Sequence, residues 1–264
     1  MKMSSLIAGA GLVLMAATAA AAAPGAETAK PPRTAAATDA PGAPAVEPKA
    51  VQALASMGGY LRTLSSFTVR SDTDSDMVTD EGEKLQFSGS NTYQVRRPNG
   101  FVIDMVSDRK VRRVVYDGKT LTVFSPRAGF YAQVPAPPTI RQTLDAVYDK
   151  YGIAVPLADL FTWGTPDAPT DHFRSAKWVG YARLGDADTD QYAFREGDID
   201  WQIWIQRGAR SLPLKVVITT DSVPQRPSFV ARLTWKTDQA FAADAFTFTP
   251  PADAKPIRLA LVEP

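Results

Sequence analysis

The sequence predicts an α+β protein that is mainly antiparallel β, a strongly curled, half-open β-barrel wrapped around an N-terminal helix and one or two lid helices. Three observations lead to this prediction. Between Phe67 and Lys236 most apolar residues recur at every second position, which is typical of strands with one buried and one solvated face. Only a few segments show helical spacing instead. About ten strands joined by short turns make a sheet too wide to stay flat, so it must curl or close.

The N-terminus has the features of a secretory signal peptide over residues 1–23. Lys2 forms a short positive region, residues 6–17 are apolar, and the alanine run at 19–23 offers small residues for cleavage. The apolar stretch is shorter than the roughly 20 residues that a membrane-spanning helix needs. We therefore expect export to the periplasm and removal of the signal peptide.

Composition divides the rest of the chain and excludes several classes of function. Residues 24–47 are rich in Ala, Pro and Thr and predict a flexible spacer, while residues 48–264 predict a single β-rich domain. The sequence has no Cys, so it offers neither disulfides nor thiolate metal ligands. It has 29 Lys and Arg against 28 Asp and Glu, and Lys2 is the only charged residue of the leader. A balanced chain without a basic cluster indicates no nucleic-acid partner.

The first half of the domain is predicted as one helix followed by a series of strands. Pro48 suits the first turn of a helix, and apolar residues at helical spacing continue it over residues 49–64. From Phe67 the period becomes two. Strands are expected at residues 85–97, 101–105, 111–116, 120–124 and 130–134. Asp117-Gly118 supplies a tight turn, and the prolines at 135–138 end the last of these strands.

The second half begins with a return to helical spacing over residues 139–151. A second short helical piece is expected over residues 156–161. Alternation then predicts strands at residues 176–184, 191–195, 201–206, 214–219 and 229–236. In the last of these Phe229, Leu233 and Trp235 face one way while Arg232, Thr234 and Lys236 face the other, so one face is buried and one is wet.

Several short motifs follow one another in a fixed order along the domain. They are Ser65-Ser66-Phe67, Val95-Arg96-Arg97-Pro98-Asn99-Gly100-Phe101, Tyr116-Asp117-Gly118-Lys119-Thr120-Leu121, Phe124-Ser125-Pro126 and Phe246-Thr247-Phe248-Thr249-Pro250-Pro251. In this order and spacing the chain resembles the LolA/LolB-like periplasmic lipoprotein-carrier superfamily, and within it a branch of uncharacterised predicted periplasmic proteins. The resemblance implies a curled sheet around an apolar cavity that takes a lipid or an acylated polypeptide.

The resemblance also assigns a role to Arg97. In the carriers, the arginine of the matching segment reaches into the cavity and hydrogen-bonds to the helical lid, which keeps the ligand-free form closed. The phase of Arg97 agrees with this role, because it shares a strand face with Phe87, Tyr93 and Val95. A guanidinium that faces a core needs partners, and lid carbonyls can supply them. The alternative is that Arg97 lies at the mouth of the sheet and extends into solvent.

Aromatic residues form the second candidate for a ligand site. The set comprises Phe87, Tyr93, Phe101, Tyr116, Phe130, Trp178, Trp201, Trp235, Phe246 and Phe248. From these and from Met105 we select the predicted ligand-binding residues Arg97, Phe87, Tyr93, Phe101, Met105, Trp178, Trp201 and Trp235. For any single member the alternative is an ordinary packed core.

Two other patterns bear on metal binding and catalysis. Asp72, Asp74, Asp76, Asp80 and Glu83 fit the spacing of a calcium loop, but Met77 stands where that loop needs glycine. We interpret them as the wet face of a strand and hairpin and expect no metal. His172 is the only histidine and no catalytic motif is present, so we predict no enzyme and no cofactor, with His172 solvated in a polar loop.

These observations together predict a monomeric, non-catalytic periplasmic binding protein. Its partner would be a lipid or an acylated polypeptide, held in an apolar cavity under the sheet, as in a carrier. The alternative is a periplasmic sensor or interaction module of the same fold that contacts a protein partner of the cell envelope.

Overall fold

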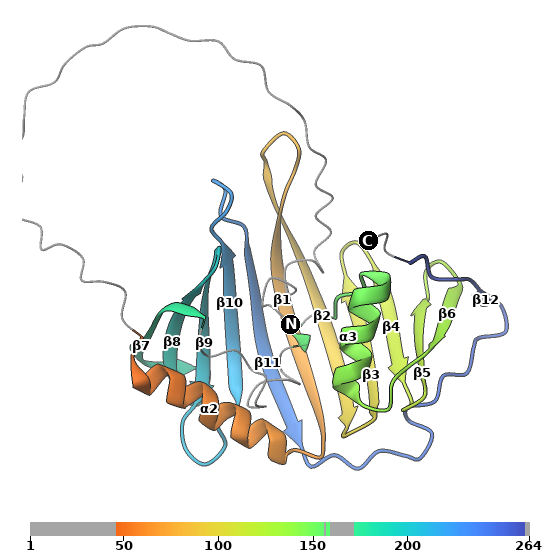
Figure 1. Ribbon diagram of the computed structural model, residues 1–264, viewed down its shortest axis with the longest axis horizontal. Coiled ribbons are helices and arrows are strands. Elements are labelled where there is room, and N and C mark those ends of the chain that lie inside the picture. The colour runs from red at the N-terminus through yellow and green to blue at the C-terminus, as the bar shows by residue number, and fades with distance from the viewer. Residues whose placement is uncertain (1–45, 156, 159–171, 262–264) are drawn as a thin grey trace, which may run out of the picture.

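The computed structural model describes residues 46–155, 157–158 and 172–261, and within these ranges a single sheet of twelve strands carries two helices (Figure 1). The signal peptide, nearly all of the spacer and most of the helical piece expected at 156–161 lie outside the described residues. The elements are α2 (Pro48–Thr63), β1 (Ser66–Val78), β2 (Lys84–Arg96), β3 (Gly100–Ser107), β4 (Val111–Tyr116), β5 (Thr120–Ser125), β6 (Phe130–Pro135), α3 (Ile140–Tyr151), β7 (Phe173–Leu184), β8 (Ala187–Glu196), β9 (Ile199–Gln206), β10 (Pro213–Thr220), β11 (Ser228–Thr237) and β12 (Lys255–Pro256).

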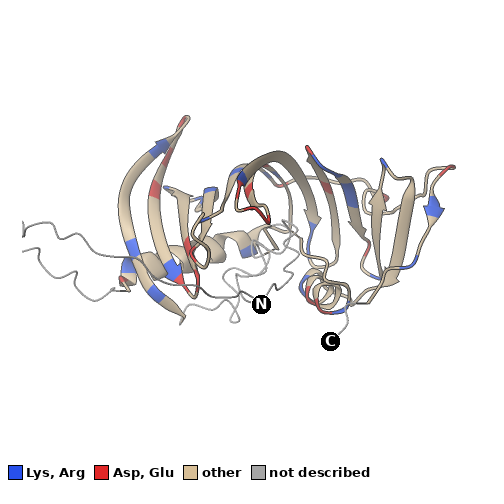
Figure 2. Ribbon diagram, turned by 90° about the horizontal axis from the view of Figure 1, so that it is seen from above, with Lys and Arg blue, Asp and Glu red and all other residues tan. Residues whose placement is uncertain are grey.

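The strand order is β12-β6-β5-β4-β3-β2-β1-β11-β10-β9-β8-β7. Every neighbouring pair is antiparallel except β12 with β6. The first long strand, β1, pairs with β2 on one side and with β11 on the other, so the two halves of the chain meet at the centre of one sheet. The sheet curls without closing, and the predicted half-open, mainly antiparallel fold is confirmed (Figure 2).

Both helices lie on the concave side of this sheet (Figure 2). Helix α2 begins with proline in its first turn and buries Leu54, Met57 and Leu61 toward the strands. Helix α3 is capped at its start by the Thr139 side chain, which accepts a hydrogen bond from the Gln142 N–H, and it ends at Gly152 in the left-handed conformation. Both predicted helices are therefore confirmed within one residue at each end.

The main core lies between the concave face and the two helices. It combines α2 and α3 residues with inward side chains from strands across the sheet, such as Phe67, Tyr93, Phe101 and Trp201. Burying such side chains contributes roughly 1.5–3 kcal/mol each. The alternation that the sequence shows therefore has its expected cause, a single apolar face against the helices.

A second, smaller cluster lies on the convex face. Val102 of β3 and Val115 of β4 are buried there under Phe246, which belongs to the segment after β11. That segment, residues 238–254, continues to β12 at the edge of the sheet. We call it the C-terminal strap. Coverage of β3 and β4 on both faces was not predicted from the sequence.

Candidate functional site

Two rows of apolar residues cross the concave face from strand to strand. The paired registers align them in the order Thr237, Phe67, Val95, Phe101, Tyr116, Leu121 and Val134 in one row, and Trp235, Val69, Tyr93, Ile103, Val114, Val123 and Ala132 in the next. Thr237 is the only polar residue in the two rows apart from the tyrosine hydroxyls. The rows form a continuous apolar floor that spans β11 to β6.

Five of the predicted ligand-binding residues face this floor or its continuation on β9. Tyr93, Phe101 and Trp201 are fully buried, while Met105 and Trp235 are half-buried and pack against the core. Trp201 stacks on Phe194, with ring centroids 4.1 Å apart. Burial raises the pKa of Tyr93 above its ordinary value, so its hydroxyl is neutral at physiological pH.

Two predicted residues lie apart from the others. Trp178 is on the edge strand β7, where the residue is 38% exposed and the Lys49 ammonium lies 3.4 Å from the ring centroid. Phe87 is in phase with Tyr93 but lies toward the far end of β2, where the Arg109 guanidinium is 5.0 Å from its ring. Neither residue belongs to the main core.

Two further members of the aromatic set lie on the convex face, and a third is in phase with the concave face but exposed. Phe246 and Phe248 pack against the convex face from the C-terminal strap, and Phe130 is exposed on β6. A pocket of about 280 Å³ lies between the strap and the sheet, with Val102, Phe124 and Phe248 among its walls. The expectation that Phe246 and Phe248 line the same cavity as the concave-face rings is therefore wrong. The continuous apolar runs at residues 101–103 and 114–116 could have predicted that these strands are covered on the convex face as well, since such runs indicate strands buried on both faces.

Arg97 immediately follows β2, and the peptide bond between Arg97 and Pro98 is cis. Its guanidinium carbon lies 6.0 Å from the centroid of Phe67, a core residue of the concave face. The Arg97 Nε is buried and has no hydrogen-bond partner among the described residues. Burial lowers the pKa of Arg97. The expected hydrogen bonds to the lid are not found within the described ranges, although the backbone ties this segment to α3 through the bond from Ile140 N–H to Pro98 O (2.9 Å).

Polar side chains on the concave face were missed by the sequence reasoning. Beyond the two apolar rows, the next row places Ser71 of β1 beside Asn91 of β2 and Met105 of β3. Ser71 and Asn91 are both buried, and the Ser71 Oγ has no hydrogen-bond partner among the described residues. The sequence could have placed Ser71 and Asn91 on the concave face, because they are in phase with Val69 and Tyr93.

The acidic residues that fit a calcium spacing lie on the convex face and around the turn between β1 and β2. Asp72 pairs with Arg70 at 2.8 Å, and Asp74 with Arg232 at 3.1 Å. The hydrogen bond from Ser88 and the contacts with Arg232 hold the pKa of Asp74 below its ordinary value. The predicted strand and hairpin are confirmed, with Asp72 and Asp74 on the wet face, but the Asp76 side chain is only 5% exposed and accepts hydrogen bonds from Ser228. Among the described residues no group of three or more His, Asp or Glu side chains could hold a metal ion.

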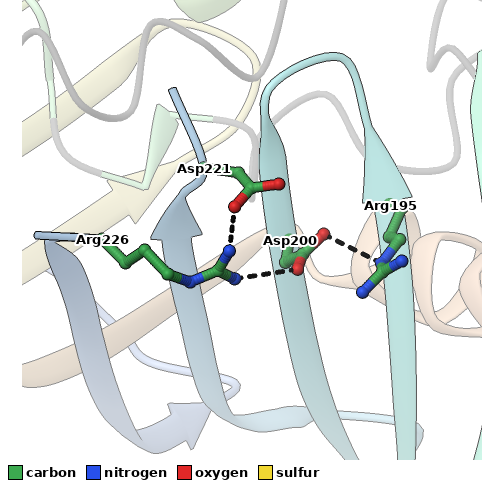
Figure 3. Close-up of polar contacts among 4 residues, drawn as sticks. All are labelled: Arg195, Asp200, Asp221 and Arg226. Carbon is green, nitrogen blue, oxygen red and sulfur yellow. Dashed lines mark hydrogen bonds and ion pairs between the residues drawn. The ribbon is translucent and has the colours of Figure 1, made fainter. Parts of the chain in front are cut away.

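A network of ion pairs lies at one end of β8, β9 and β10 (Figure 3). Asp200 contacts the Arg195 Nε at 3.2 Å and the Arg226 Nη2 at 3.2 Å, and Arg226 also pairs with Asp221. All four side chains reach solvent, where such pairs contribute little to stability. We interpret the network as support for the turn between β10 and β11.

His172 lies outside this network, and its side chain is exposed, as predicted.

The sequence over residues 50–260 matches the family model DUF2092, described as "Predicted periplasmic protein". The chain belongs to the DUF2092 family. This confirms the predicted membership of an uncharacterised periplasmic family and the periplasmic location. In the described ranges of the DUF2092 chain, no helix is long and apolar enough to cross a membrane. No curated protein matches the sequence.

Solved structures include chains that are similar to this DUF2092 protein. An uncharacterised conserved protein from Thermus thermophilus has 12% identity and a TM-score of 0.47, with 80% of this chain and 99% of that chain covered. LprF from Mycobacterium bovis has 14% identity and a TM-score of 0.42, with 81% and 100% covered. A LolA superfamily protein from Nitrosomonas europaea has 12% identity and a TM-score of 0.33, with 75% and 96% covered.

Proposed function

We propose that this periplasmic protein binds the acyl chain of a lipid or of an acylated polypeptide against the concave face of its sheet, without catalysing a reaction. The observation that carries the proposal is the apolar floor of two residue rows from β11 to β6, which two helices cover at separate places (Figure 1). The motifs shared with the lipoprotein carriers support the same class of ligand.

The floor has the chemistry that an acyl chain requires. Half-buried apolar side chains at its margins, among them Met105, Val123 and Trp235, already pack against the core and can contact a chain that lies on it. Each methylene that leaves water contributes about 0.8 kcal/mol, so a long chain needs no polar contact to be held. Balanced charge along the sequence leaves apolar burial as the main source of affinity.

Tryptophan fluorescence tests the proposal, because two tryptophans lie on opposite faces of the sheet. Trp235 is half-buried on the concave face, 5.6 Å from Phe67, whereas Trp204 faces outward beside Lys215. The probe is the methyl ester of dibromostearic acid, a neutral acyl chain whose bromines quench nearby indoles. We expect saturable quenching in the wild type, clearly weaker quenching in Trp235→Phe and wild-type quenching by the probe in the matched control Trp204→Phe.

Two results would overturn the proposal. One is the absence of saturable quenching in delipidated, folded protein. The other is quenching that Trp204→Phe reduces and Trp235→Phe does not, since the chain would then lie on the convex face. Native mass spectrometry of protein purified from periplasm adds an independent readout: a co-purifying acylated molecule supports the proposal, and empty protein that retains one specific envelope protein contradicts it.

A further inference from the structure

Arg97 is a half-buried cation without a counter-charge in the described ranges of the chain. No acidic side chain there forms an ion pair with it, and its Nε is buried without an acceptor. Other arginines are paired, for example Arg70 with Asp72, Arg113 with Asp104 and Arg232 with Asp74. A desolvated, unpaired charge costs free energy that an anion beside it would recover.

The neighbouring Arg96 differs from Arg97, because among the described residues the Arg97 Nε, but no Arg96 nitrogen, is buried without a hydrogen-bond partner. The two residues are adjacent in sequence but face opposite sides of the sheet. The Arg96 guanidinium lies 4.6 Å from the ring of Phe246 on the convex face, whereas Arg97 approaches Phe67 on the concave face. Both guanidiniums therefore lie over an aromatic ring, and the contact of Arg96 is the closer of the two.

Arg97 also lies at one end of the apolar floor. Phe67, whose ring is 6.0 Å from the Arg97 guanidinium carbon and 5.6 Å from the Trp235 ring, belongs to the outermost apolar row. An acyl chain that contacts the half-buried Trp235 with its end toward Phe67 would bring its head group to the guanidinium. The planar guanidinium offers paired donors that match a carboxylate or a phosphate.

We propose that Arg97 binds an anionic head group, so that the ligand of this protein is an acyl chain ending in a carboxylate or a phosphate. The inference rests on the proposed function and specifies its ligand class. It differs from the lid contact that the carrier resemblance implies, because here the partner of Arg97 is the ligand.

Three probes with the same chain length separate the charge from the chain: hexadecanoic acid, hexadecyl phosphate and hexadecanol. Affinities are measured by displacement of a neutral fluorescent acyl probe from delipidated full-length protein. In the wild type we expect at least one of the two anions to bind about 10- to 100-fold more tightly than hexadecanol, the factor of a charge-assisted hydrogen bond. The anion that shows the preference identifies the head group as carboxylate or phosphate.

The variants assign this preference to one residue. Arg97→Gln should bring the ratio of anion to hexadecanol affinity to about one, whereas Arg96→Gln should keep the wild-type ratio. Equal wild-type affinities for all three probes would overturn the inference while the proposed function stands. Tighter binding of the anions by Arg97→Gln would also overturn it and favour the lid contact. Failure of every probe to bind would overturn both proposals.

Discussion

At the scale of single residues, Glu196 resembles Arg97 in having a buried charged-group atom without a hydrogen-bond partner among the described residues. It ends β8, and its Oε2 is buried without a hydrogen-bond donor among the described residues. Burial raises the pKa of Glu196, and the nearby His172 opposes this shift only in part. A carboxyl whose folded-state pKa is raised favours folding fully below its unfolded pKa, and this contribution is lost as pH rises through the folded value.

Glu196→Gln should therefore be more stable than the wild type at neutral pH and equally stable in acid. The amide replaces a carboxylate that is poorly solvated once it ionises. Urea unfolding from about pH 4 to about pH 8 measures the difference, which should grow with pH. Asp198→Asn, at an exposed position of the same turn, should show no such growth. A difference in unfolding free energy between Glu196→Gln and the wild type that stays constant or shrinks as pH rises would contradict this account.

At the scale of elements, the C-terminal strap holds the convex face of β3 to β5. Phe246 is buried against Val102 and Val115, and Phe248 contacts the rings of Phe124 and Tyr131 at 5.5 Å each. Both strands beneath Phe246 are thus buried on two faces, and their outward valines would be exposed without the strap.

Phe246→Ala should lower the free energy of unfolding by about 3 kcal/mol, the loss typical of a buried phenylalanine. Denaturant unfolding measures this change, and limited proteolysis should cut the strap of the variant faster. Phe130→Ala is the control, because that ring is 41% exposed and should cost less than about 1 kcal/mol. Equal losses in the two variants would show that the strap adds no particular stability.

At the scale of the whole molecule, the open sheet has a protected centre and two edges. The two longest strands, β1 and β2, pair along their length at the centre, while β7 pairs with a named strand only on one side. The β7 edge carries the exposed side chains of Val179 and Tyr181 and a bulge between Trp178 and Gly180. Such bulges discourage edge-to-edge pairing.

Amide hydrogen exchange should be slowest at the centre of the sheet and fastest at its two edges. Amides in the inner halves of β1, β2 and β11 should exchange most slowly, because opening them requires disruption of the whole core. Amides of β7 and β12 should exchange soonest by local opening. Exchange followed by mass spectrometry on proteolytic fragments measures this, and protection of β7 equal to that of β1 would indicate a further partner at that edge.

The sequence by itself determined the local structure of this protein. Helix 49–64 and strand 111–116 match α2 and β4 closely, because an apolar period of 3.6 or 2 reflects backbone geometry that neighbouring residues set together. The inward phase of Arg97 also follows from that period. The short β12 was missed, since two residues are too few to show any period.

The tertiary structure alone decided which residues share a surface. Phe87 and Tyr93 are in phase on one strand, yet only Tyr93 belongs to the core beneath the helices. Phe246 belongs to an apolar motif, yet it covers the convex face. Period tells which side of a strand a residue faces, whereas burial depends on elements that are distant in sequence and pack on that side. The unpaired guanidinium of Arg97 is a fact of the same kind, because its surroundings are assembled from several elements of the fold.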